Sequence, residues 1–153
     1  DIGWRVIAPL AETADWVQID DVYQAQRIAA GIAHQGNDFP ANDAFAHDIG
    51  LDILDGIDFA KGCYVGQELT ARTKYRGLVK KRLMPLRVDG PMPDAGAKVM
   101  LGEREAGEVT TGAEGWVLAL MRLERVEQAR ETGEPLVCGA ARLQVDLPAW
   151  LEI

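Results

Sequence analysis

Apolar residues first recur at helical spacing in this chain. Between residues 20 and 32 the apolar positions lie three or four residues apart, which predicts an amphipathic helix. These positions are Val22, Ala25, Ile28, Ala29 and Ile32. Asp20 or Asp21 can cap the start of the helix, because aspartate accepts hydrogen bonds from free backbone N–H groups at a helix N-terminus. A polar loop at 37–48 and a short apolar turn or helix at 49–59 are expected to follow.

A second helix is predicted over residues 66–76. Glu68 lies in its first turn and basic residues fill its last turn, so both ends complement the helix dipole. Arg72 stands four residues after Glu68, in the favourable order for a helical ion pair. Gly77 is the expected C-terminal cap.

The pattern changes to short strands after Gly77. An isolated strand is predicted at 3–10, and further strands at 81–88, 98–101, 106–111, 116–121, 136–138 and 141–146. Residues 102–105 are expected to form a hairpin connection, and residues 124–131 one or two helical turns. Five or six short strands at this spacing predict a small barrel or sandwich, with the boundary between the two parts of the chain near residues 77–81.

Composition indicates a soluble globular protein. The 153 residues are 48% apolar and 26% charged, and no stretch approaches the length of a membrane span. Two cysteines are too few for a disulfide framework, so both are expected to be reduced thiols in a cytoplasmic protein. No signal peptide opens the chain, and the absence of an initiator methionine suggests a fragment or a processed protein.

The charge is segregated along the chain. The net charge is −8, yet residues 69–88 contain seven basic residues and no acidic one. This segment could form an anion-binding face, or it could be a solvated surface whose charges balance acidic neighbours.

The segment most able to carry chemistry surrounds Cys63. Gly62 and Gly66 free the backbone on both sides, the predicted helix starts just after the thiol, and Lys61 lies two residues before it. A helix N-terminus and a nearby cation both favour thiolate over thiol, which is the setting of a reactive cysteine. The alternative is a tight turn in which Cys63 packs. Cys138 ends an apolar strand and is expected to fill space in a core.

The sequence contains no motif of a common metal, nucleotide or serine-nucleophile site. His34 and His47 share no metal-ligand spacing with the cysteines, so no bound metal is expected. There is also no phosphate-binding P-loop, no dinucleotide fingerprint and no nucleophile elbow.

Three segments resemble one known family. The run Lys-Gly-Cys-Tyr-Val-Gly-Gln-Glu at 61–68, followed by Arg72 and Arg76-Gly77, closely resembles the signature of YgfZ proteins. The sequences Gly-Glu-Val-Thr-Thr at 107–111 and Leu-Ala-Leu-Met-Arg at 118–122 resemble a pattern that YgfZ proteins share with the glycine-cleavage aminomethyltransferase. The segment from Arg27 to Gly31 resembles the helix that precedes the signature.

The resemblance implies an α+β fold. Residues 1–79 would be the C-terminal part of a mixed α/β folate-binding domain of the GcvT/YgfZ type, and residues 80–153 a small antiparallel β-barrel. It implies tetrahydrofolate or a derivative as cofactor, and iron–sulfur proteins or their assembly machinery as partners. Cys63 would be the functional thiol. The implied cofactor-binding residues are Lys61, Gly62, Tyr64, Gly66, Gln67, Glu68, Arg72 and Arg76.

Two functions follow from the resemblance. The first is a folate-binding accessory protein that supports iron–sulfur cluster assembly or maintenance, including in tRNA-modifying enzymes. The second is a tetrahydrofolate-dependent aminomethyltransferase, in which case the protein would be an enzyme; that class carries a glutamate where this chain has Ala29. A third reading, from charge alone, is a module that docks nucleic acid or an acidic partner, although one basic segment without an aromatic ladder gives it little support.

Overall fold

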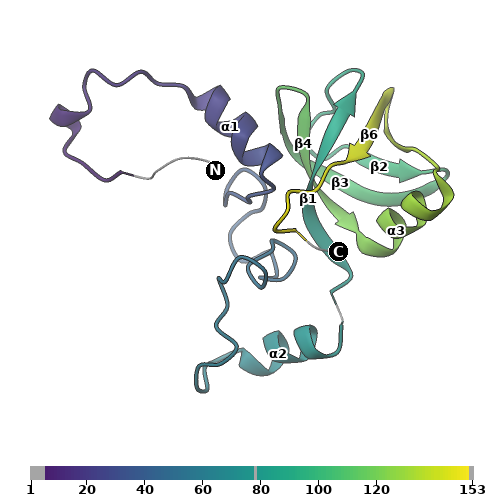
Figure 1. Cartoon of the computed structure of the whole chain (residues 1–153), viewed down its shortest axis with the longest axis horizontal. Helices are drawn as coiled ribbons and strands as arrows, with labels where there is room; N and C mark the ends of the chain where they lie inside the picture. Colours follow the sequence, from purple (N-terminus) through teal and green to yellow (C-terminus); the bar gives the residue numbers. More distant parts are fainter. Residues whose placement is uncertain (1–5, 78, 152–153) are drawn as a thin grey trace.

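The computed structural model describes residues 6–77 and 79–151. A closed barrel of six strands occupies the C-terminal half, and two helices joined by long loops occupy the N-terminal half (Figure 1). Neighbouring strands are antiparallel and follow the order β1-β4-β3-β2-β5-β6 around the barrel. The strands are β1 Lys81–Asp89, β2 Lys98–Leu101, β3 Arg104–Ala113, β4 Trp116–Arg122, β5 Leu136–Cys138 and β6 Ala141–Val145. The α+β fold with a small antiparallel barrel, expected from the sequence, is confirmed.

Strand β4 explains how the barrel joins the rest of the chain. Val117, Ala119 and Met121 are fully buried and belong to the core inside the barrel. Leu118 points to the other face, where it forms a second cluster with Leu83 of β1 and Ile28. A strand covered on both faces reads as a continuous apolar run, which is the sequence seen at 117–121.

The predicted strands from residue 81 onward match the observed ones closely, with small corrections. Arg104 and Glu105 belong to β3, so the hairpin connection is only Gly102-Glu103. The polar stretch at 124–131 is a full helix, α3 (Leu123–Thr132), which buries Val126 in the barrel core. Cys138 is buried in the same core, as expected.

The N-terminal half departs more from expectation. Residues 3–5 of the strand expected at 3–10 lie outside the described residues. Residues 6–9 form no strand, and a short 3₁₀ helix, η1, follows at Leu10–Glu12. The expected element at 49–59 is a series of turns without a helix. No helix in the described ranges is long and apolar enough to cross a membrane.

Both predicted helices are present. Helix α1 runs Asp20–Ala29, but its N-cap is Ile19, so the expected aspartate cap is wrong. The reason is local: the Asp20 carboxylate accepts a hydrogen bond from the Gln18 amide at 2.8 Å. Helix α2 runs Gln67–Tyr75, contains no buried residue, and stands apart from the barrel in Figure 1.

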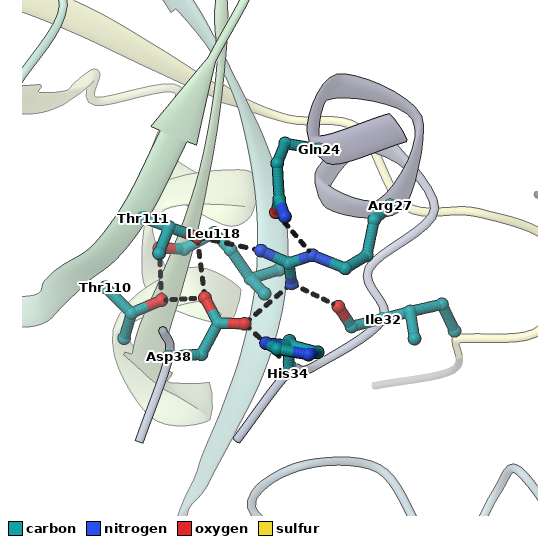
Figure 2. Close-up of polar contacts among 8 residues, drawn as sticks. All are labelled: Gln24, Arg27, Ile32, His34, Asp38, Thr110, Thr111 and Leu118. Carbon is teal, nitrogen blue, oxygen red and sulfur yellow. Dashed lines mark hydrogen bonds and ion pairs between the residues drawn. The ribbon is translucent and has the colours of Figure 1, made fainter. Parts of the chain in front are cut away.

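A buried ion pair joins α1 to the loop that follows it. The side chains of Arg27 and Asp38 are 1% and 0% exposed and lie 2.6 Å apart. The Arg27 guanidinium also donates to the Gln24 amide oxygen at 2.9 Å and to the Ile32 carbonyl at 2.6 Å (Figure 2). The backbone N–H of His34 donates to Asp38 at 2.7 Å, so both charges have several partners. A buried charge is tolerated only when it is paired and hydrogen-bonded in this way.

A β-bulge in β3 completes the network. The pairing of β3 with β4 shifts between Val109 and Thr111, which leaves Thr110 as the extra residue. A bulge breaks the alternation of side chains, so two consecutive residues can face one partner. The hydroxyls of Thr110 and Thr111 lie 3.0 Å and 2.6 Å from the same Asp38 oxygen, Oδ1 (Figure 2).

The C-terminal segment holds the end of α1 from another side. The indole N–H of Trp150 donates to the Ala30 carbonyl at 2.9 Å. Gly31 ends the helix at a φ of +71°, a conformation that L side chains rarely adopt. A Cβ atom there would also lie 3.2 Å from both Pro85 and Trp150, so this position favours glycine twice.

We expect Asp38→Ala to lower the free energy of unfolding by about 3–5 kcal/mol, because it leaves the Arg27 charge buried without its partner. Urea denaturation measures the effect. The matched control is Glu68→Ala, which breaks the exposed pair between Glu68 and Arg72 and should cost less than about 1 kcal/mol. Equal costs for the two variants would contradict the role assigned to the buried pair.

Candidate functional site

Cys63 lies exposed in the loop that leads into α2. A turn at Asp58 precedes this loop: one carboxylate oxygen accepts hydrogen bonds from the backbone N–H groups of Ala60 and Lys61, at 2.8 Å and 3.1 Å. Gly66, with a φ of +89°, caps the start of α2. The thiol therefore sits between two defined turns, close to a helix N-terminus, as the sequence predicted.

Three of the expected site residues lie together in this loop. The Lys61 ammonium is 4.5 Å from the centre of the Tyr64 ring, a cation–π contact. The Gln67 side chain accepts a hydrogen bond from the backbone N–H of Tyr64 at 3.4 Å. These contacts arrange the chain around Cys63 without covering the thiol.

Of the other expected site residues, Gly62 and Gly66 lie in the loop before α2, and the remaining three follow along the helix to its C-cap. Glu68 and Arg72 form the predicted ion pair, with both side chains largely exposed. Arg76 is the C-cap residue, at the other end of a nine-residue helix roughly 14 Å long. In the described ranges no hydrogen bond or ion pair joins Arg76 to the Cys63 loop, so the structure does not gather the eight predicted residues into one cluster.

The basic segment at 69–88 is also less uniform than its sequence suggests. Arg82 is only 6% exposed and does not belong to a basic surface, which corrects its grouping with Lys80 and Lys81. Its guanidinium donates to both carboxylate oxygens of Asp52, at 2.9 Å and 3.2 Å, and to the His47 carbonyl at 3.0 Å. The pair joins the turns at 46–55 to β1, and no local pattern in the sequence indicates Asp52 as the partner of Arg82.

A pocket of about 320 Å³ lies where the loop at 38–49 meets the barrel. Charged side chains of both signs line its walls: Asp38, Asp43, Asp48, Lys81, Glu105, Glu108 and Arg122. Cys63 is not among the residues that line it. Within residues 6–77 and 79–151, no three histidine, cysteine or acidic side chains converge as metal ligands.

Two neighbouring carboxyl groups at this junction titrate in opposite directions. Burial raises the pKa of Asp48, and the nearby positive charges of Lys81 and Arg82 only partly offset that effect. Burial also opposes ionisation of Asp52, but the hydrogen bonds and charge of Arg82 outweigh it and lower the pKa of Asp52. Burial alone raises the pKa of the Cys138 thiol.

The opposite pKa shifts of Asp48 and Asp52 imply opposite contributions to stability. The folded-state pKa of Asp52 lies below its unfolded value, near 3.9, so its stabilisation is present at neutral pH and is lost as the pH falls through the folded pKa. The folded-state pKa of Asp48 lies above its unfolded value, so its ionisation opposes folding at neutral pH.

We expect Asp52→Asn to destabilise the protein at pH 7 and Asp48→Asn to stabilise it. Denaturation midpoints at pH 7 and pH 3 measure both effects, and destabilisation by Asp48→Asn would contradict this assignment.

Comparisons with known proteins agree with the observed barrel fold. Residues 80–153 match the family model described as "CAF17, C-terminal beta-barrel domain". A solved structure of the glycine cleavage system aminomethyltransferase T from Bartonella henselae covers 85% of this chain and 38% of its own, with a TM-score of 0.56. At 17% sequence identity this likeness concerns the fold alone.

Several similar curated proteins are named as iron–sulfur cluster assembly factors. The mouse protein "Iron-sulfur cluster assembly factor IBA57, mitochondrial" is 33% identical over 137 residues, which are 82% of this chain and 38% of the mouse protein. The human protein of that name is 34% identical, over 69% of this chain and 31% of its own. A Mycosarcoma maydis homologue is 43% identical over 56% of this chain and 22% of its own.

These findings define what the chain is similar to. It spans less than two fifths of the length of these curated relatives. Their names place them in mitochondria, which contradicts the cytoplasmic location expected from the sequence. The more specific resemblance to YgfZ stays a prediction. Residues 80–153 match the family model of the CAF17 C-terminal β-barrel domain, and most of the chain is similar to iron–sulfur cluster assembly factors of the IBA57 type.

Proposed function

We propose that this chain belongs to an accessory protein for iron–sulfur cluster assembly or maintenance that uses Cys63 as its functional thiol. The observation that carries the proposal is the exposed position of Cys63 in a loop bounded by two defined turns. A thiol that only fills space would be buried, as Cys138 is. Similarity to proteins named as cluster assembly factors supports the same function.

The proposal includes folate and the organisation of the chain. Residues 1–79 would be the end of a folate-binding domain, residues 80–153 its barrel domain, and tetrahydrofolate or a derivative the cofactor. The fold shared with an aminomethyltransferase supports this part. The proposed partners are iron–sulfur proteins, including tRNA-modifying enzymes, and the cluster assembly machinery. The exposed loop leaves room for a partner to approach the thiol.

Aminomethyl transfer has less support in the structure than the accessory role. Ala29 is the last residue of α1, where the aminomethyltransferases carry a pterin-binding glutamate, and its methyl group cannot hydrogen-bond to a pterin. Among the carboxylates near the barrel junction, Asp38 is occupied by Arg27, and Arg82 occupies both oxygens of Asp52. The geometry therefore favours a function that depends on the thiol.

We expect Cys63→Ser to abolish most of the iron–sulfur function, by tenfold or more, without loss of stability. The thiol is exposed, so its replacement should change the free energy of unfolding by less than about 0.5 kcal/mol. The measurement is the activity of an iron–sulfur enzyme, per amount of enzyme, in cells whose own factor is replaced by the full-length protein. Cys138→Ala is the control, because it removes the other thiol. Full activity of Cys63→Ser would exclude a functional role for this thiol.

The folate part of the proposal has its own test. Arg76 has no acidic partner in the described ranges, whereas Glu68 already neutralises Arg72. If the α2 arginines bind the carboxylates of a folate, Arg76→Ala should weaken tetrahydrofolate binding by about threefold to tenfold and reduce its dependence on salt. Arg72→Ala should have a smaller effect, and the exposed Arg104 of β3 supplies the control, Arg104→Ala. Calorimetric titration of the full-length protein at two salt concentrations measures the tetrahydrofolate affinity of each variant. Unchanged tetrahydrofolate affinity in both α2 variants would show that these arginines do not bind folate.

A further inference from the structure

A second pocket, of about 330 Å³, lies between α2 and the turns that precede the barrel. Its size is that of small-molecule sites in proteins. One wall is the face of α2 that carries Leu69, Thr70 and Thr73, residues three or four positions apart. The opposite side is formed by Phe45, Ala46, His47, Asp48, Val79, Lys80 and Lys81.

The apolar part of this pocket is open to water. Phe45 is 63% exposed and Leu69 is 59% exposed, although both line the same hollow. Val79 and Ala46 extend the apolar surface between them. Large apolar side chains that line a hollow and remain exposed are covered at low cost by the apolar body of a ligand.

The polar part of the pocket is rich in hydrogen-bond donors. Lys80 and Lys81 line it, and neither forms an ion pair with the described residues. His47 is 4% exposed, and its Nε2 atom is buried without a hydrogen-bond partner. The hydroxyls of Thr70 and Thr73 already donate to the backbone carbonyls of Gly66 and Leu69, so the lysines and His47 remain the donors that a ligand would meet. Buried polar atoms without partners are uncommon and often mark a place where a ligand or water binds.

We propose that this pocket binds a small molecule that joins an apolar, ring-sized body to a carboxylate, with the body between Phe45 and Leu69 and the carboxylate at Lys80, Lys81 and His47. Lys80 and Lys81 line the pocket together with a single carboxylate, Asp48, so the balance of charge favours an anion. Asp48 opposes the ligand charge and Lys81 lies near it to offset that opposition.

Binding at this pocket would also act on α2. The helix has no buried residue, and its aromatic contacts are limited to the packing of Tyr75 and Lys74 against Phe59. A ligand between α2 and the turns at 45–48 would bury Leu69 and Thr73 and hold the helix against the barrel. Since the Cys63 loop continues directly into α2, the same ligand would restrict the loop. This inference is independent of folate and of the proposed iron–sulfur function.

The probe that tests the site is 2-naphthoate, and the uncharged 2-naphthamide is its matched control. Titration of the isotopically labelled chain by NMR should give saturable shifts at the amides of Leu69, Thr73 and Lys80, with naphthamide binding about tenfold more weakly because it lacks the charge. Amide exchange in α2 should slow when naphthoate is bound. Equal binding of the two compounds, shifts located elsewhere, or no binding up to millimolar concentrations would overturn the proposal.

Variants separate the two parts of the pocket. Lys80→Gln and His47→Phe should each weaken naphthoate several-fold and leave naphthamide unchanged, whereas Leu69→Ala should weaken both compounds. Asp48→Asn should tighten naphthoate because it removes an opposing charge. Lys98→Gln, on β2 outside the pocket, should change neither. Lys80 is exposed, so its variant folds even if the buried His47 variant does not, and unchanged naphthoate affinity in Lys80→Gln would refute the carboxylate site.

Discussion

The ion pair between Arg27 and Asp38 is the interaction on which the arrangement of this molecule depends. Its two charges come from α1 and from the loop that follows it, and both are almost completely buried against the barrel. Water cannot replace either partner at this depth, so the pair, its hydrogen bonds and the β3 bulge form together or not at all. The position of α1, of the loop at 34–38 and of the turns beyond it on the barrel all follow from this arrangement (Figure 2).

The segment that carries Cys63 is held quite differently. Its contacts are exposed, local in sequence and few: a turn at Asp58, the contact of Lys61 with Tyr64, and the Glu68–Arg72 pair. Contacts of this kind contribute little to stability, and segments that depend on them open at a lower free energy than the core does. Binding residues are commonly found on such loops, attached to a rigid scaffold. The fixed barrel and the accessible thiol therefore have separate physical origins in one short chain.

The comparisons fit this division. The barrel has a family match of its own, and the fold persists in a structure that shares only 17% of its sequence. A shared fold of this kind carries many chemistries, so function has to be argued from the site residues. Here the proposed functional thiol lies in the Cys63 loop, and Asp48 and Asp52 occupy opposite electrostatic environments at the junction of charged turns before β1.

Local spacing was sufficient to predict most of the elements. The strands at 98–101 and 136–138 match to the residue, and the helix before Gly77 is off by one residue at each end, because alternation, glycines and charges at helix ends act within a few positions. The same local rules predicted the buried strand cysteine, Cys138, but left open whether Cys63 is a reactive thiol or packs in a turn, and the structure places it exposed. They failed at the start of α1, where a neighbouring amide occupies the Asp20 carboxylate.

The partners of the buried charges were decided only by the tertiary structure. Asp38 contacts threonines 72 and 73 positions later in the chain, and Arg82 contacts a carboxylate 30 positions earlier. In sequence, Asp38 resembles any loop aspartate and Arg82 resembles the two lysines before it. Burial and partnership depend on which segments the closed barrel brings together, and local spacing carries no information about contacts at that separation. The sequence thus determined the elements and the position of the thiol, and the barrel decided which charges would be buried, because only closure of the chain removes them from water.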